Sequence, residues 1–325
     1  MEAVAVSGLV KEYGSVKAVK GVDFDITPGE TFGFLGPNGA GKSTTINMLC
    51  TLVRPTSGTA TVAGFDVTHQ REDVRRSIGL VFQDSTLDNY LTAEQNLRFH
   101  AELYGVPRPV VRPRLEAVLE LVGLADKAKA QVRTFSGGMK RRLEIARGLL
   151  HAPVVLFLDE PTIGLDPQTR RSIWEYIRSL KQTEGTTIFM TTHYMDEAEY
   201  CDRIGIIDKG SIVAMGSPEQ LKASVGQDRV QVQTDDPAGA IAALGERFGT
   251  KAAVHEGQVT FSVANGGEFV PKLFTELAAL NIPVRSVGVS RPSLDDVFLS
   301  YTGSTIRDAE AGTTNEWMRR MARSR

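Results

Sequence analysis

A glycine-rich segment holds the residues best suited to phosphate chemistry. The apolar run Phe32–Leu35 stops at Gly36, and Lys42 and Ser43 follow after further glycines. Glycines let the backbone curl closely with its N–H groups directed inward, because no Cβ is in the way. A helix that begins near Lys42 would point the positive end of its dipole at the same spot. The pattern predicts a P-loop, which binds nucleotide phosphates together with Mg²⁺.

Two adjacent carboxylates are the second chemical signal. The continuous apolar run Val154–Leu158 is typical of a parallel strand buried on both faces, and it ends at Asp159 and Glu160. Another β-rich run, Thr186–Thr192, ends at His193. Because ligands of open α/β sheets bind at the carboxyl ends of the strands, we expect these polar side chains at the phosphate site.

A serine followed by two glycines opens a predicted helix within Thr134–Leu150. Ser136 suits the N-cap position, where its hydroxyl accepts a hydrogen bond from the first turn. The periodicity places Arg141, Glu144 and Arg147 off the apolar face of this helix.

Composition limits the class of protein. The chain has 325 residues with 42% hydrophobic and 23% charged residues, which indicates one large or two ordinary soluble domains. A net charge of −2 argues against a general nucleic-acid binder. The sparse cysteines, Cys50 and Cys201, fit a reducing compartment and buried positions. Since no apolar run reaches the ~20 residues that span a bilayer and no signal peptide is visible, we expect a cytoplasmic protein.

The elements that must position these residues alternate between strands and helices. Val4–Ile26 is typical of antiparallel strands, and helical spacing fills residues 84–135, where Gly105 and Pro107–Pro113 interrupt two helical blocks. Arg203–Asp208 and Ser211–Met215 are two further predicted strands. The pattern predicts a main domain at 1–217 with a helical insertion at about 84–135.

Residues 218–303 show a different order of strands and helices. The expected elements, in order, are a strand (Arg229–Gln233), a helix (Pro237–Phe248), two strands around Glu256-Gly257, a helix (Gly267–Leu280) and a strand (Val284–Val289). This β-α-β-β-α-β order predicts a small α+β domain of the ferredoxin-like type. The tail at 304–325 is polar and ends in basic Trp317–Arg325, for which we favour a solvated segment over a weak contact with acidic lipid.

Taken in order, the motifs resemble a known family. They are GPNGAGKST at Gly36–Thr44, Gln83 after a strand, FSGGM at Phe135–Met139, LFLDEP at Leu156–Pro161, Gly164–Asp166, and His193 after two threonines. The stretch Val4–Met215 resembles the nucleotide-binding subunit of ATP-binding cassette (ABC) transporters. The resemblance implies an α/β P-loop NTPase fold with an antiparallel β subdomain and a helical subdomain.

The resemblance also implies roles for single residues. ATP would contact Tyr13, which stacks on adenine, and the loop residues Gly36, Pro37, Asn38, Gly39, Ala40, Gly41, Lys42, Ser43 and Thr44. Mg²⁺ would be held by Ser43, Gln83 and, through water, Asp159. Glu160 would be the general base for the attacking water, assisted by Lys42, Gln83 and the switch histidine His193.

The same family works as a dimer. Its signature residues, here Ser136, Gly137 and Gly138, point at the γ-phosphate bound by the opposite subunit, and Asp166 would lie at this seam. Because the chain carries one full set of motifs, the implied partner is a second copy. Phe135 and Met139 replace the family's more common Leu and Gln, a change that spares the serine and the backbone donors.

A subgroup resemblance concerns transport. FSGGM and the segment Arg291–Gly303 resemble ATPases of the daunorubicin-resistance type. This implies export of a hydrophobic drug, antibiotic or lipid through a separate membrane permease, with the chain peripheral on the inner face of the cell membrane.

Two other classes of function stay open at this point. One is a soluble ABC-type ATPase acting on ribosomes or DNA, although such proteins carry two cassettes or a long coiled coil that this chain lacks. The other is a small-molecule sensor in the C-terminal domain, for which we prefer a dimerisation or stabilising role.

Overall fold

A computed structural model describes residues 2–255 and 258–303. Contacts divide the chain into two compact units, one extending to Pro218 and the other comprising Glu219–Gly303. We call them the cassette unit and the C-terminal unit and describe each by itself. The basic segment Trp317–Arg325 lies outside the described residues.

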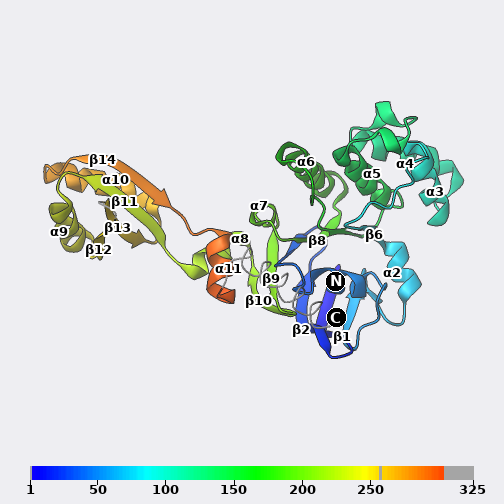
Figure 1. Ribbon diagram of the computed structural model, residues 1–325, viewed down its shortest axis with the longest axis horizontal. Coiled ribbons are helices and arrows are strands. Elements are labelled where there is room, and N and C mark those ends of the chain that lie inside the picture. Colours follow the sequence, from blue (N-terminus) through cyan, green and yellow to red (C-terminus); the bar gives the residue numbers. More distant parts are fainter. Residues whose placement is uncertain (1, 256–257, 304–325) are drawn as a thin grey trace, which may run out of the picture. The chain divides into compact units, whose positions relative to one another are not determined.

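The cassette unit is built on a six-stranded sheet of order β10-β9-β3-β8-β7-β6 (Figure 1). Its strands are β3 (Thr31–Leu35), β6 (Ile78–Val81), β7 (Val155–Asp159), β8 (Thr187–Thr192), β9 (Arg203–Asp208) and β10 (Ser211–Gly216). All neighbours are parallel except β10, which runs antiparallel to β9. Every residue of β3, β7 and β8 is buried, as expected for parallel strands covered on both faces.

A four-stranded antiparallel sheet forms the second layer of this unit. It consists of β1 (Val4–Tyr13), β2 (Val16–Ile26), β4 (Ser57–Val62) and β5 (Phe65–Asp66) in the order β2-β1-β4-β5. Phe24 of this sheet packs on Phe32 and Phe189 of the main sheet, with ring centroids 5.5 and 5.9 Å apart. This aromatic cluster joins the two sheets into one core.

Helices complete the cassette unit. They are α1 (Lys42–Leu49), α2 (Arg71–Ser77), α3 (Ala93–Leu103), α4 (Arg108–Leu121), α5 (Gly137–Leu149), α6 (Pro167–Glu184) and α7 (Met195–Ala198). Helices α3, α4 and α5 pack on one another, and α5 packs on β6 (Figure 1). The expected interruption at Pro107–Pro113 is wrong in part, because α4 begins at Arg108 and contains Pro113. Burial of Leu115, Val118 and Leu119 compensates for the hydrogen bond that Pro113 removes.

The C-terminal unit has the β-α-β-β-α-β order expected from the sequence. Its strands are β11 (Asp228–Thr234), β12 (Ala252–His255), β13 (Gln258–Val263) and β14 (Val284–Ser290), and its helices are α8 (Pro218–Val225), α9 (Pro237–Phe248), α10 (Gly266–Ala279) and α11 (Leu294–Thr302). The antiparallel sheet has the order β12-β13-β11-β14. Helices α9 and α10 share its apolar core, whose centre includes Val230, Phe261 and Leu273. The sequence did not predict α11, which begins with a capping box of Ser293 and Asp296.

Candidate functional site

The predicted P-loop connects β3 to α1, and its glycines are required by close backbone approaches. A Cβ on Gly36 would lie 2.2 Å from the carbonyl oxygen of Ile207. Gly41, the residue before α1, has a φ of 108°, and a Cβ there would lie 2.6 Å from the carbonyl oxygen of Ala18. These positions exclude larger residues and hold the start of α1 against the sheet edge.

Lys42 is a buried cation at the first position of α1. Its Nζ donates to the carbonyl oxygens of Gly36 and Pro37 at 2.6 and 3.2 Å. The same nitrogen lies 3.2 Å from Oε1 of Glu160. The lysine therefore joins the loop to the end of β7, where a carboxylate balances its charge.

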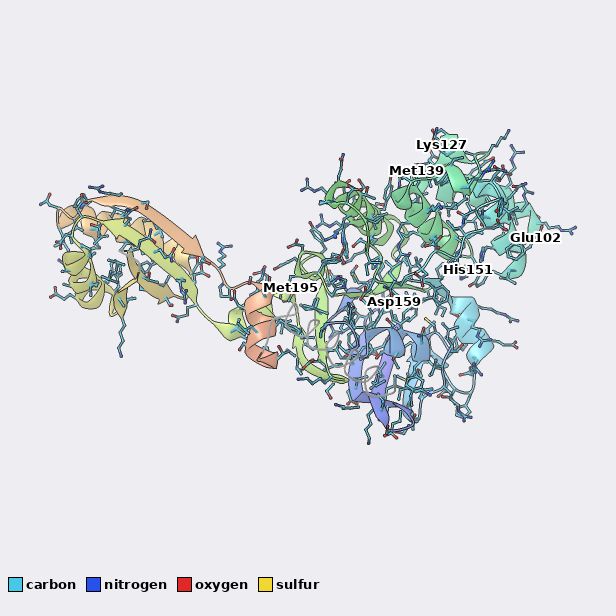
Figure 2. The ribbon with its side chains drawn as sticks, viewed as in Figure 1. Glu102, Lys127, Met139, His151, Asp159 and Met195 are labelled. Atoms are coloured by element: carbon cyan, nitrogen blue, oxygen red, sulfur yellow. The ribbon has the colours of Figure 1, made fainter. Side chains whose placement is uncertain are left out.

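Asp159 and Ser43 place a carboxylate and a hydroxyl side by side next to the loop. Ser43 Oγ donates to Asp159 Oδ1 at 3.2 Å, and Thr191 Oγ1 donates to the same oxygen at 2.5 Å. Figure 2 labels Asp159 inside the cassette unit, at the end of β7. No group of three or more His, Cys, Asp or Glu in the described residues forms a metal cluster. The hydroxyl and carboxylate suit Mg²⁺ that arrives with phosphates, because that ion keeps several waters and takes few protein ligands.

Glu160 is held in an unusual backbone conformation directly after β7. Its φ is 44°, a value that costs energy for a residue with a Cβ, and its N–H donates to Thr191 Oγ1 at 3.0 Å. Its Oε1 lies 3.2 Å from the Lys42 ammonium and 3.4 Å from Nδ1 of His193. Its Oε2 is buried and has no hydrogen-bond partner among the described residues. The free oxygen is an acceptor available to a water molecule.

Charges around Glu160 keep it ionised. Burial acts to raise the pKa of Glu160, while the neighbouring His193 ring and the Lys42 ammonium act to lower it. The net result is a pKa below the ordinary glutamate value. The structure thus brings Lys42, Ser43, Asp159, Glu160 and His193 together from two strand ends, those of β7 and β8, and from the start of α1.

Ser136 and the glycines after it form the N-terminal end of α5. Ser136 Oγ accepts from the Met139 N–H at 3.3 Å, and Ser136 and Gly137 are exposed. Gly138 is different, because it is buried and a Cβ there would lie 2.3 Å from Cγ2 of Thr169. Packing between α5 and α6 thus accounts for Gly138.

Asp166 caps α6. Its Oδ1 accepts from the N–H groups of Gln168 and Thr169, and its Oδ2 accepts from the Thr169 hydroxyl at 2.6 Å. The hydrogen bond from the Thr169 side chain contributes most to lowering the pKa of Asp166. Thr169, whose hydroxyl donates to Asp166, is also the residue whose methyl group lies next to Gly138.

Other predicted residues lie outside this hydrogen-bonded cluster. Tyr13 ends β1 and is 48% exposed, with Lys11 Nζ 4.8 Å from its ring centroid. Gln83 is exposed after β6, and Asn38 is exposed in the loop. Exposed positions of this kind are free to meet a nucleotide or a second chain.

Comparisons with known proteins decide the family. Residues 19–163 match the ABC transporter model, and residues 216–302 match the model of the C-terminal domain of ATP-binding proteins like DrrA1-3. The linearmycin resistance ATP-binding protein LnrL of Bacillus subtilis (strain 168) is 41% identical over 92% of this chain and 97% of its own. The chain belongs to the ATP-binding subunits of ABC transporters.

Further comparisons agree with this family. The daunorubicin/doxorubicin resistance ATP-binding protein DrrA of Streptomyces peucetius is 40% identical over 94% of either chain. The dimeric post-hydrolysis structure of the ATP-binding cassette MJ0796 with ADP and Pi superposes with a TM-score of 0.60 and 28% identity, covering 66% of this chain and 98% of that chain. This ABC subunit therefore binds and hydrolyses ATP. No helix in the described ranges is long and apolar enough to cross a membrane.

The structure of this ABC subunit corrects one expectation about α5. Arg141, Glu144 and Arg147, which the periodicity placed off the apolar face, are buried. Arg141 donates to the carbonyl oxygens of Pro161 and Asp159 at 2.5 and 3.1 Å, and it lies 3.2 Å from Oε2 of Glu144. Apart from Glu144, the partners of Arg141 are backbone carbonyls, so the periodicity of side chains in the sequence does not predict these contacts.

Glu197 is a second residue that the sequence reasoning missed. This buried carboxylate accepts from the Thr192 hydroxyl at 2.6 Å and from the Thr162 hydroxyl. It thereby connects the loop after Glu160 to the end of β8, next to His193. Burial raises the pKa of Glu197, and the two threonine hydrogen bonds oppose that rise. Glu197 follows His193 by four residues in the sequence, but His193 precedes α7 (Met195–Ala198), so this spacing alone does not predict the contacts of Glu197.

Proposed function

We propose that two copies of this chain hydrolyse MgATP between their cassette units and so drive export of a hydrophobic drug, antibiotic or lipid through a separate permease. One observation supports the catalytic part most strongly. Oε2 of Glu160 is a buried acceptor that has no hydrogen-bond partner in the described part of the chain, and it lies beside Lys42, Asp159 and His193. Such an oxygen is suited to a water molecule that attacks a phosphate held by the loop.

The proposed reaction follows from these positions. Lys42 exchanges its present partners for β- and γ-phosphate oxygens. Mg²⁺ held by Ser43, Gln83 and, through water, Asp159 would supply positive charge against the phosphates. Glu160 Oε2 accepts a proton from water as the water oxygen bonds to the γ-phosphorus. The bond from that phosphorus to the bridging oxygen breaks, which gives ADP and phosphate, while His193 contacts the γ-phosphate.

Exposure of the α5 start supports a site shared between copies. Ser136 and Gly137 lie at the exposed N-terminal end of the 13-residue helix α5, and the partial positive charge of a helix N-terminus favours anions. Asp166 is exposed at the neighbouring α6 start and would lie at the seam. The MJ0796 cassette, whose structure is described as dimeric, is a precedent for such pairing.

A groove on the cassette unit supports the permease as partner. Its volume is about 370 Å³, and its lining includes Leu52, Leu80 and Phe82 together with Arg75 and Arg147. Apolar walls with cationic groups suit an amphipathic cytoplasmic segment of a membrane protein. Phe82 precedes Gln83, so a segment in this groove would lie one residue from a proposed Mg²⁺ contact. We therefore place the chain peripherally at the inner face of the membrane.

The cargo class rests on relatives alone. LnrL and DrrA are named for resistance to linearmycin and to daunorubicin and doxorubicin, and both match this chain over both units. We propose a hydrophobic compound of comparable character as cargo.

Replacing Glu160 with glutamine tests the catalytic proposal. Because Gln keeps the size but loses the base, we expect kcat to fall about 10²–10⁴-fold while ATP binding persists. Glu102→Gln, an exposed carboxylate on α3 (Figure 2), serves as the matched control and should leave kcat unchanged. Glu160→Gln with the parent kcat would contradict the assignment. Recovery of the chain with ribosomes or chromatin and never with membranes would contradict the transport role.

A further inference from the structure

The C-terminal unit has one long sheet edge whose outer backbone groups pair with no strand of the described residues. Strand β14 lies at the end of the order β12-β13-β11-β14, and it pairs only with β11. It has 7 residues, VRSVGVS, most of them exposed. An exposed edge of this kind is a template for another strand unless something blocks it.

Strand β14 lacks the usual blocking features. It contains no proline or lysine, and its irregularity in pairing is confined to its start, at Val284. Its one charged side chain, Arg285, is bound to Asp235 of the same unit at 2.7 Å. The charge that would repel a second strand is thus already paired.

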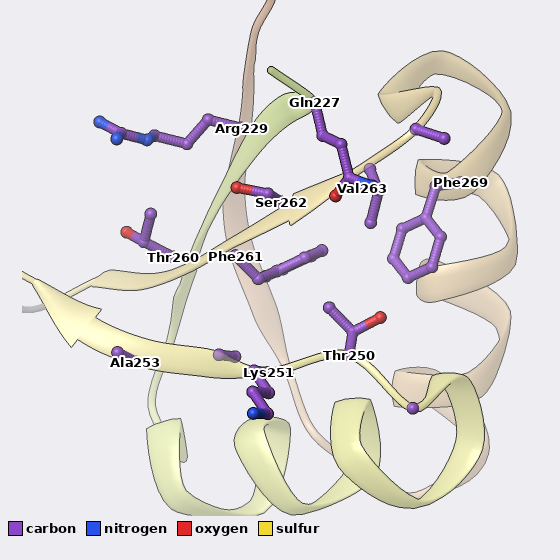
Figure 3. Close-up of a pocket in the computed structure, with 13 residues that line it drawn as sticks. Gln227, Arg229, Thr250, Lys251, Ala253, Thr260, Phe261, Ser262, Val263 and Phe269 are labelled. Atoms are coloured by element: carbon purple, nitrogen blue, oxygen red, sulfur yellow. The ribbon is translucent and has the colours of Figure 1, made fainter. Parts of the chain in front are cut away.

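The opposite edge of the same sheet is shorter. Strand β12 has 4 residues, and the last residues of β13 extend beyond it beside an open cleft of about 780 Å³. Figure 3 shows this cleft, into which Phe261 and Phe269 project near Thr250. Proteins use very short edge strands to limit strand addition, so the two edges differ in how long a template they offer.

The sequence of β14 is complementary to itself about a two-fold axis at Val287. Antiparallel pairing centred there places Val287 opposite Val287 of the partner subunit and overlaps the strand along its full length. Ser286 then faces the partner subunit's Gly288, and Arg285 faces the partner subunit's Val289. No like charges meet, and a β-branched pair lies at the centre.

We propose that β14 pairs with β14 of a second copy, so that two four-stranded sheets become one continuous sheet. The inference goes beyond ATP hydrolysis, although it rests on the proposed need for two copies. Pairing through β14 requires no nucleotide, whereas closure of the cassette units does. The C-terminal units would therefore hold two copies together between rounds of hydrolysis and keep the effective concentration of the cassettes high.

Crosslinking of the full chain tests the register. Val287→Cys should form a covalent dimer with a short bifunctional thiol reagent, because the two-fold axis brings position 287 of both copies together. Val254→Cys is the matched control, since Val254 lies on β12 and is 53% exposed. Cys50 and Cys201 are buried and do not compete. Equal crosslinking of the two variants, or none at position 287, would overturn the proposal.

A lysine on the edge tests the assembly without nucleotide. Sedimentation of the full chain should show a dimer for the parent, and Ser286→Lys should raise the dimer dissociation constant by about tenfold or more. Ser262→Lys places the same charge at an exposed position of β13 in the same sheet and should leave the dimer intact. An unchanged dimer in Ser286→Lys, or a monomeric parent, would overturn the inference.

The same variants separate this inference from the proposed function. In a Glu160→Gln background with MgATP, Ser286→Lys should still dimerise, because the cassette units close on nucleotide. If that dimer forms with MgATP but Ser286→Lys does not weaken association without nucleotide, the β14 proposal fails while the proposed shared ATP site stands. If β14 holds the copies together but MgATP adds no closure, the shared ATP site fails instead.

Discussion

The two units of this chain differ in what they bury. The cassette unit buries charged side chains, among them Lys42, Arg141, Glu144, Glu160 and Glu197. In the described part of the C-terminal unit, no charged residue is buried, and the core is apolar with Thr234 as its buried polar residue. Burying a charge is costly unless a partner balances it, so such groups mark the place where chemistry requires them.

The comparison assigns the two units different duties. In the cassette unit, paired charges link strand ends around Glu160, which also has a strained backbone. The C-terminal unit has an apolar core and an edge strand, β14, that pairs only with β11 among the described residues, which would suit a role in assembly. We therefore expect substitutions of buried charges to affect turnover, and changes in the C-terminal unit to affect association.

Loss of the buried cation should have the largest effect. Lys42→Ala should lower ATPase activity by about 10²-fold or more, because the proposed contacts with the β- and γ-phosphates and the charge opposite Glu160 disappear. Steady-state phosphate release and fluorescent-nucleotide binding measure the effect. Lys127→Ala removes an exposed lysine (Figure 2) and should change neither quantity. Comparable ATPase activity of the two variants would contradict the expectation that the buried lysine matters for turnover and the exposed lysine does not.

Breaking a buried ion pair should cost stability. Arg141→Ala leaves Glu144 and several carbonyl groups without their partner, so the free energy of unfolding should fall by about 3–5 kcal/mol. The matched control is Arg112→Ala, which removes an exposed ion pair with Glu116 at 2.9 Å. Urea unfolding of both variants checks the difference. Equal decreases in the free energy of unfolding would mean that burial does not determine how much these ion pairs contribute to stability.

Removal of the C-terminal unit should leave nucleotide binding intact. A chain ending at Ser217 keeps all the residues of the site, so its ATP affinity should equal that of the parent. Its yield of assembled complex should fall, because the proposed assembly domain is gone. Equilibrium binding and affinity co-purification with the permease measure the two quantities. Equal complex yields would show that the unit has no part in assembly.

The pH dependence of Glu160 is the smallest expected effect. Because its pKa in the folded chain is lowered below the ordinary value of 4.5, its ionised form stabilises the fold above pH 4.5. That contribution is lost as the pH falls through the lower folded pKa. Between about pH 6 and pH 3, the free energy of unfolding should fall more steeply with decreasing pH for the parent than for Glu160→Gln. Parallel curves would show that Glu160 is not stabilised as a carboxylate.

The sequence predicted those parts of the site that depend on local pattern. The P-loop, the strands before Asp159 and His193, and the β-α-β-β-α-β order all follow from periodicity and turn residues, and the α/β fold and family are confirmed. Partners that come from distant backbone could not be predicted in this way. Arg141 bonds to carbonyls at Asp159 and Pro161, so its burial depends on how α5 meets β7.

The packing of a glycine also depends on distant residues, so the sequence alone does not predict it. Gly138 belongs to a motif, yet its buried position is explained by contact with Thr169, a residue on α6. Only the packed helices show which of the motif's glycines faces outward. The roles of Tyr13, Gln83 and Asp166 stay predictions, since these exposed residues would acquire partners from nucleotide or from a second copy.

The shared site is tested most directly by mixing two inactive variants. Lys42→Ala lacks the phosphate lysine, and Ser136→Asp keeps the α5 cap but places a negative charge at the proposed γ-phosphate contact. One site of a mixed dimer then combines the intact loop of the second variant with the intact serine of the first. The account predicts that an equimolar mixture regains ATPase activity that neither variant has alone. A mixture as inactive as its folded components would contradict it.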